Sequence, residues 1–200
     1  MKKGLSRIIF EFLSIVVAVV LAMGLTEWRQ DYLNRQLAEK SFQNIVAEIS
    51  ENLESLRSDS VRIARDREFM TKWVRDWVSE GAPGPFEAGF RLSILSTAAW
   101  EVAKVNQSLT HLSNERNMAM AEIYALQDFY TVKASAVFDL MGSLQGVARD
   151  QTSEEFFQVV QKLRYHMNLV FNTVPAYIDG CEDFLEEYGH APSEPSEESD

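Results

Sequence analysis

Residues 42–77 read FQNIVAEISENLESLRSDSVRIARDREFMTKWVRDW, and an apolar residue recurs at every seventh position: Phe42, Ile49, Leu56, Ile63, Met70 and Trp77. A seven-residue repeat keeps apolar side chains on one side of an α-helix. The pattern predicts a long helix over residues 28–79, with a bend somewhere along it. The second row of this seam is apolar at Val46, Leu53 and Val74 but broken at Ser60 and Arg67. This interruption favours packing against helices of the same domain over a clean self-associating coiled coil.

Upstream of this helix, residues 8–25 form an apolar run of 18 residues. At about 1.5 Å per residue a helix of this length spans about 27 Å, close to the hydrocarbon thickness of a bilayer. Trp28 and Tyr32 follow the run, where amphipathic aromatic rings prefer the membrane interface. The sequence therefore predicts a short cytoplasmic stub and a transmembrane signal anchor over residues 1–27.

The charges that flank the run predict its orientation. Lys2, Lys3 and Arg7 precede it without an acidic residue, whereas the far flank is mixed in sign. The positive-inside rule then places the N-terminus in the cytoplasm and the following domain outside. A cleaved signal peptide is the competing interpretation, with residues 22–24 as the cleavage site. The length of the run and the charge of Glu11 argue against it.

Glu11 itself has two interpretations. It lies one helical turn after Arg7, so the two side chains could pair near the head groups while the anchor remains passive. Alternatively, Glu11 belongs to a helix-packing face that continues through Ser14, Ala18 and Ala22. Small residues at this spacing let a second membrane helix approach closely.

Downstream, residues 80–89 contain three Gly and two Pro and predict a loop. A second helix is expected over residues 96–112, and Ser113 is expected to cap the next one. The third helix, over residues 115–148, is apolar nearly all round, which places it at the centre of a bundle. Gly142 and Gly146 lie four residues apart on it, a spacing typical of close helix packing.

The fourth helix is expected to begin at a capping box formed by Thr152 and Glu155. Its apolar residues recur at spacings of three and four up to Val174, and Pro175 is expected to break or kink it. A last stretch over residues 176–188 ends at Gly189, and the acidic tail over residues 190–200 is expected to be disordered. The whole pattern predicts an all-α protein, in which a transmembrane helix precedes a roughly four-helix bundle over residues 28–189.

Composition and motifs argue against several kinds of chemistry. The net charge of −11 opposes binding to nucleic-acid phosphates. Cys181 is the single cysteine, so an intramolecular disulfide is excluded, and a buried inert thiol is favoured over an intermolecular disulfide. His111 and Glu115 are four residues apart, but the expected turn at Ser113 lies between them; His166 has no acidic neighbour at metal-ligand spacing, and His190 lies in the tail. No phosphate-binding or nucleophile motif occurs. The sequence therefore predicts no catalytic residue, no metal site and no cofactor.

Aromatic residues crowd the region around the Gly/Pro loop: Trp73, Trp77, Phe86, Phe90 and Trp100. The simpler interpretation is a core plug where the first two helices meet. The alternative is a docking patch or apolar pocket, since Trp is common among residues that dominate binding energy.

Three segments carry a resemblance to other proteins. They are EFLSIVVAVVLAMGLTEWRQ, LAEKSFQNIVAEISENLESL and TAAWEVAKVNQSLTHLSNERNMAMAEIYALQDFY. Together they resemble a group of uncharacterised bacterial single-pass membrane proteins that have an anchor ending in a Glu-Trp pair, a long helix and a Trp-centred segment. The resemblance covers most of residues 8–130. It implies the same architecture and an inner-membrane location, and it implies no activity.

These observations favour a membrane-anchored, non-enzymatic interaction or scaffold protein that contacts a protein partner or a second copy of itself. The alternative is an extracytoplasmic helical bundle that senses a small ligand and signals through a membrane partner. About seven residues are expected on the cytoplasmic side, which is too few for an output domain. The alternative therefore requires that partner.

Overall fold

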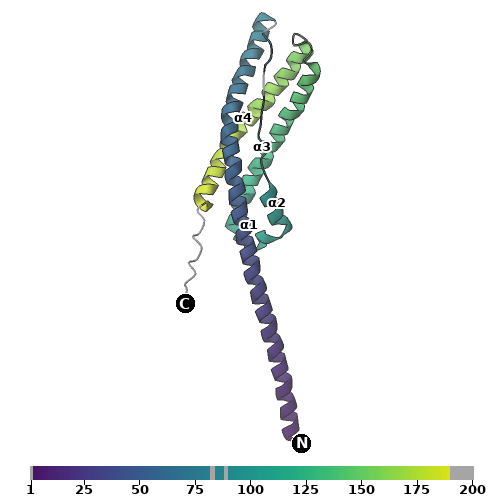
Figure 1. Cartoon of the computed structure of the whole chain (residues 1–200), viewed down its shortest axis with the longest axis vertical. Coiled ribbons are helices and arrows are strands. Elements are labelled where there is room, and N and C mark those ends of the chain that lie inside the picture. Colours follow the sequence, from purple (N-terminus) through teal and green to yellow (C-terminus); the bar gives the residue numbers. More distant parts are fainter. Residues whose placement is uncertain (1, 82–83, 88–89, 190–200) are drawn as a thin grey trace.

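The computed structural model describes the backbone of residues 2–81, 84–87 and 90–189, and the side chains of these residues from Leu13 onward. It contains four α-helices, α1 (Lys2–Glu80), α2 (Ala98–Val105), α3 (Asn114–Val147) and α4 (Glu154–Tyr188), and a 3-10 turn, η1 (Ser108–His111). No strand occurs in the described ranges. The predicted all-α class, a long N-terminal helix followed by a helical domain, is confirmed (Figure 1).

Helix α1 runs through both the expected anchor and the first helix of the domain. It is uninterrupted over 79 residues and appears as a gently curved rod that projects far beyond the other helices (Figure 1). The bend expected somewhere within residues 28–79 takes the form of this gentle curve, and the helix is not broken. No Gly or Pro, the residues that commonly cause sharp kinks, occurs between Gly24 and Gly81.

The heptad seam of α1 is the core-facing side of the helix, as predicted. Phe42, Ile49, Leu56, Ile63 and Met70 are all buried, and Trp77 is partly buried against the same core. Another row of buried residues lies three positions after each of the five buried seam residues: Ile45, Asn52, Asp59, Asp66 and Trp73. The sequence analysis did not predict that three polar residues of this row would be buried.

Helix α4, and not α3, is the central helix of the bundle. It packs against both α1 and α3, whereas α1 and α3 share little backbone contact. An extended segment that we call the strap (residues 90–97) runs along the bundle between α1 and α3 (Figure 1). The apolar residues of α3 therefore face α4 and the strap. The expectation that α3 lies at the centre of the bundle is wrong.

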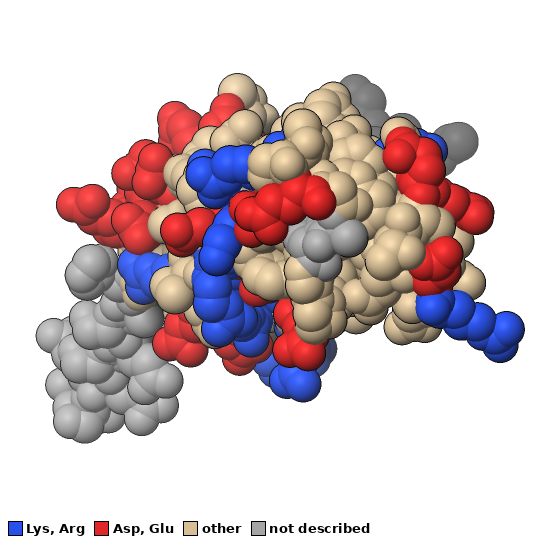
Figure 2. Space-filling view, turned by 90° about the horizontal axis from the view of Figure 1, so that it is seen from above, with Lys and Arg blue, Asp and Glu red and all other residues tan. Residues whose placement is uncertain are grey.

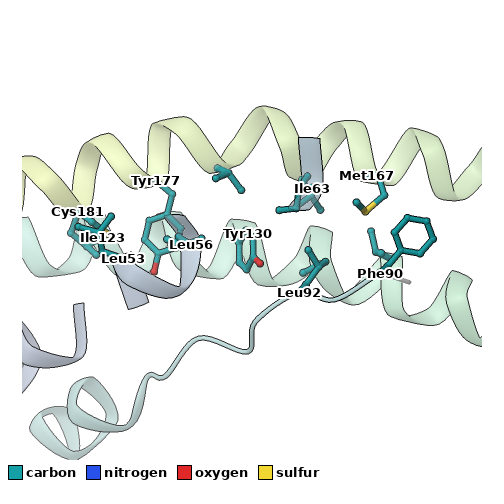
Figure 3. Close-up of a cluster of buried hydrophobic side chains, with 14 of the residues drawn as sticks. Leu53, Leu56, Ile63, Phe90, Leu92, Ile123, Tyr130, Met167, Tyr177 and Cys181 are labelled. Atoms are coloured by element: carbon teal, nitrogen blue, oxygen red, sulfur yellow. The ribbon is translucent and has the colours of Figure 1, made fainter. Parts of the chain in front are cut away.

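The core is a continuous column along the inner side of α4. Val160, Leu163, Met167, Val170 and Val174 are almost fully buried, as the spacing of apolar residues in the fourth helix predicts. Figure 3 shows Met167, Tyr177 and Cys181 of α4 directed toward Ile63 and Leu56 of α1, with Tyr130 and Ile123 of α3 nearby. Residues of the strap, Phe90 and Leu92, complete this side of the core.

The expected break at Pro175 does not occur, because α4 continues across it to Tyr188. Pro175 lies on the exposed side of the helix, so its ring meets no core residue. Burial of Val174, Tyr177 and Cys181 on either side of it holds the inner face in place. Packing therefore outweighs the one backbone hydrogen bond that proline removes.

The ends of the helices differ in detail from expectation. Ser113 caps α3 as predicted, but the cap of α4 is Ser153, whose hydroxyl accepts a hydrogen bond from the Phe156 amide. The Thr152 hydroxyl instead donates to Asp150, so Thr152 and Glu155 form no capping box. The second helix is shorter than expected, because Gln107 adopts a left-handed backbone (φ 55°) and separates α2 from η1.

The glycine at a close helix contact is not one of those expected. A Cβ added to Gly142 or Gly146 would meet nothing within 4 Å, so these residues do not mark close packing. A Cβ on Gly180 of α4 would instead lie 3.0 Å from Cδ1 of Leu126 on α3. Gly180 therefore marks a close approach of the two helices.

Candidate interaction surfaces and the buried polar network

The N-terminal part of α1 has no packing partner within the chain. All described side chains from Leu13 to Leu33 are exposed, and the first buried residue of the helix is Ala38. In the described part of the chain, α1 is the one helix whose length and hydropathy would allow it to cross a membrane, and none of its apolar window is buried. An apolar surface of this extent requires an apolar environment outside the protein.

The predicted helix-packing face lies on this exposed segment. The side chain of Glu11 falls outside the described residues. Ser14, Ala18 and Ala22 are exposed on the described part of α1. Pairing through this face remains a prediction.

The predicted aromatic docking patch separates into two clusters. At the far end of α1, Trp73, Phe86 and Phe90 are buried, and Trp77 stacks on Phe157 of α4 at 5.0 Å between ring centroids. The indole nitrogen of Trp73 donates to the Gly84 carbonyl at 3.0 Å, which fixes the loop over the cluster. Burial of three of these rings favours the core-plug interpretation at this end.

Trp100 does not belong to that cluster. It lies on α2 and stacks on Tyr124 of α3, with 4.8 Å between centroids and 11° between ring planes. The ammonium of Lys104 lies 5.5 Å from the Trp100 ring centroid. The prediction that Trp100 packs with the other four aromatic residues is therefore wrong, because the strap carries α2 back to the middle of α1.

Glu48 forms the centre of a buried polar network that the sequence analysis missed. One carboxylate oxygen accepts hydrogen bonds from the Ser96 hydroxyl at 2.6 Å and the Ala99 amide at 2.9 Å. The other accepts from the Tyr124 hydroxyl at 2.5 Å. A carboxylate on α1 thereby caps the N-terminus of α2 and binds α3.

Asn52 lies one turn further along α1 and binds the strap as a neighbouring strand would. Its side chain accepts from the Ser96 amide at 2.9 Å and donates to the Ser96 carbonyl at 2.8 Å. Gln127 of α3 donates to the same carbonyl at 2.9 Å and accepts from the Tyr177 hydroxyl at 3.0 Å. The network therefore joins α1, α3, α4 and the strap.

Asp59 repeats this arrangement two turns higher. Its carboxylate accepts from the Ser93 amide at 2.5 Å and the Ser93 hydroxyl at 3.1 Å, and it pairs with Arg62. Burial, and next the negative charge of Asp59, raise the pKa of the nearby Tyr130 hydroxyl. Burial likewise raises the pKa of Tyr124, and Glu48 adds to that shift. Both tyrosines therefore remain protonated.

The network was missed because its members resemble ordinary surface residues in the sequence. One signal was available: Asn52, Asp59 and Asp66 recur at the same seven-residue interval as the apolar seam and lie beside it. A polar residue at a core-facing position needs a hydrogen-bond partner, here the backbone of an extended segment. That partner lies more than 30 residues away along the chain.

A shallow hollow of about 380 Å³ lies between α1 and α2, beside Glu48. Asn44, Ala47 and Glu51 line it from α1, and Ala98 and Val102 line it from α2. Within the described residues no three His, Cys, Asp or Glu side chains come together as a metal site would require. Cys181 is fully buried, and its burial raises the pKa of the thiol to about 12.

Charged side chains of both signs cover the end of the domain far from the N-terminus. Figure 2 shows Asp and Glu around the edges of this face, Lys and Arg between them, and a broad uncharged area. This face therefore presents no single-sign field that would select a partner by charge alone.

No protein-family model matches the chain, and neither the curated proteins nor the solved structures include a significant match.

Proposed function

We propose that the chain is a single-pass membrane protein whose helical domain acts as a non-enzymatic interaction or scaffold module. One observation carries this proposal: α1 is a single helix that exposes an apolar membrane-length segment and then forms the core of the domain. An anchor that continues into the core without a flexible linker holds the domain in a fixed orientation above the membrane.

The buried polar groups support a structural role for the domain. Glu48, Asn52 and Asp59 are each engaged by the strap or by α2, at distances typical of strong hydrogen bonds. Side chains that are occupied in this way hold the fold together.

We further propose that the N-terminus is cytoplasmic and the domain periplasmic, in a bacterial inner membrane. The excess of Lys and Arg on the N-terminal flank supports this orientation. In cells, alkaline phosphatase fused after Gly189 should be active, because the enzyme matures only outside the cytoplasm. An inactive fusion, together with an active cytoplasmic reporter at the same position, would contradict this topology.

A ligand-sensing bundle is a second candidate, favoured by the hollow between α1 and α2. The hollow borders Glu48, and α1 connects this residue to the membrane segment without interruption. Purification in mild detergent followed by mass spectrometry distinguishes the two candidates. A stoichiometric protein, including a second copy, supports the interaction role, whereas a retained small molecule supports sensing.

A further inference from the structure

In a membrane-anchored chain, the part of α1 between the membrane segment and the domain is surrounded by water and is not packed into the bundle. We call this part of the helix the stalk (residues 26–37); it ends at Ala38, the first buried residue of α1. Leu33 and Leu37 of the stalk expose 45% and 44% of their surface, although both lie beyond the apolar run. An unpacked helix of this length is only marginally stable in water.

The two leucines belong to a longer pattern that we call the heptad stripe. The stripe has spacings of three and four and comprises Val16, Val19, Met23, Thr26, Gln30, Leu33 and Leu37, all of which are exposed. This spacing places all seven residues on one side of the helix, as in the a and d positions of a coiled coil. The stripe crosses the membrane boundary, so contact with lipid explains its lower half but not Leu33 and Leu37.

The two polar members of the stripe are compatible with burial. The Thr26 hydroxyl donates to the Ala22 carbonyl of its own helix at 2.8 Å, so its hydrogen-bonding need is already met. Gln30 donates to Asn34 at 3.0 Å and retains further donor and acceptor capacity. A single polar layer among apolar ones is the device that fixes register and oligomer number in parallel coiled coils.

We propose that the heptad stripe is the contact face of a parallel homodimer, in which α1 of a second copy packs against α1 of the first. This proposal rests on the proposed function. Two copies anchored in one membrane with the same orientation have parallel helices at equal height. Equivalent residues then meet, with Gln30 facing Gln30 between layers of Thr26 and Leu33.

The residues beside the stripe permit this pairing. In a parallel pair Arg29 lies across from Asn34 of the second copy, and Ala22 lies across from Glu27, so no like charges oppose each other. The next position of the register is Lys40, where two like charges would meet, so close contact of the two helices ends at Leu37. Beyond it the register continues through Asn44, Ala47 and Glu51, which line the hollow beside α2, so the hollow faces the second copy.

This face differs from the predicted face of Glu11, Ser14, Ala18 and Ala22. Along an ideal helix that predicted face continues in the stalk at Arg29 and Gln36. Tyr32 and Arg35 lie on the side of the stalk away from Leu33 and Leu37, so they serve as controls for the heptad stripe.

Cysteine cross-linking of the full chain in isolated membranes tests the proposal. Leu33→Cys and Leu37→Cys report on the stripe, Tyr32→Cys and Arg35→Cys are matched controls on the other side, and the wild type has only the buried Cys181. On addition of copper phenanthroline, the two stripe variants should form at least about fivefold more disulfide-linked dimer than the controls, because disulfide formation requires Cα atoms within about 7 Å.

Each other outcome overturns the proposal in a recognisable way. Equal cross-linking at all four positions would indicate random collision, and cross-linking at Tyr32 and Arg35 alone would indicate pairing through the side of the stalk opposite the heptad stripe. An adduct of different mass would identify another protein as the occupant. If the chain resists carbonate extraction but forms no dimer, the homodimer proposal is wrong while the membrane anchor of the proposed function stands. A chain recovered only in the soluble fraction would overturn the proposed function as well.

Discussion

At the scale of single residues, Glu48 shows how a surface-like residue determines the architecture. It is 7% exposed, yet it accepts hydrogen bonds from the strap, α2 and α3. These partners lie 48 to 76 residues away in the sequence. One carboxylate therefore joins α1 to three segments that are distant from it in the sequence.

Replacing Glu48 should destabilise the whole domain. Glu48→Ala leaves the Tyr124 hydroxyl and the Ala99 amide without their acceptor, and we expect the free energy of unfolding to fall by about 3 kcal/mol. Urea unfolding of the detergent-solubilised chain, followed by circular dichroism, measures the change. Glu51→Ala, one turn away and exposed, is the matched control and should change it by less than about 0.5 kcal/mol. Equal effects of the two variants would show that the network contributes no stability.

The thiol of Cys181 should be unreactive in the folded chain. Its pKa of about 12 lies above the ordinary value, so the thiol stays protonated at pH 8 and the nucleophilic thiolate is almost absent. Maleimide at pH 8 should label the native chain negligibly and the urea-unfolded chain completely. Arg35→Cys, which adds an exposed thiol on the side of the stalk away from the heptad stripe, should label once per chain under native conditions. Native labelling of Cys181 would contradict its burial in the core.

At the scale of elements, local patterns predicted more than long-range contacts did. The α1 seam and the Ser113 cap depend on neighbours within a few residues, and both are present as predicted. The position of the strap depends on hydrogen bonds from Asn52 and Asp59 to residues far along the chain, which no periodicity reveals. The strap then decides two further features: it separates α1 from α3, and it places Trp100 against Tyr124.

The glycines of α3 and α4 give a prediction at this scale. Gly142→Ala and Gly146→Ala should each raise the free energy of unfolding by about 0.5–1 kcal/mol, because alanine favours helix and the added Cβ meets no atom. Gly180→Ala should give no gain, because its Cβ would approach Leu126 at 3.0 Å. Thermal unfolding of the three variants provides the comparison. A loss of stability at Gly142 would indicate that another surface covers α3 there.

At the scale of the whole molecule, one helix has two separate environments. The described side chains of α1 from Leu13 to Leu37 are not buried within the chain, and from Ala38 onward the inner side of the helix forms part of the core. The sequence revealed the change in hydropathy after Leu25 but not the stalk, because residues 28–37 share the amphipathic character of the domain helix. The domain over residues 28–189, as predicted from sequence, thus begins about ten residues before the packed bundle.

This division predicts that the packed bundle folds without the anchor. Deleting residues 1–34 removes the apolar run and none of the buried side chains that the structure describes, so the remaining chain should be soluble. Its melting temperature should stay within about 4 °C of the full chain in the same detergent buffer. Deleting residues 1–45 also removes Phe42 and Ile45, which are 1% and 0% exposed. Loss of a buried side chain of this size costs about 2–5 kcal/mol, so this shorter chain should not fold cooperatively. If the first deletion also abolished cooperative folding, the stalk would have to contribute to the stability of the bundle.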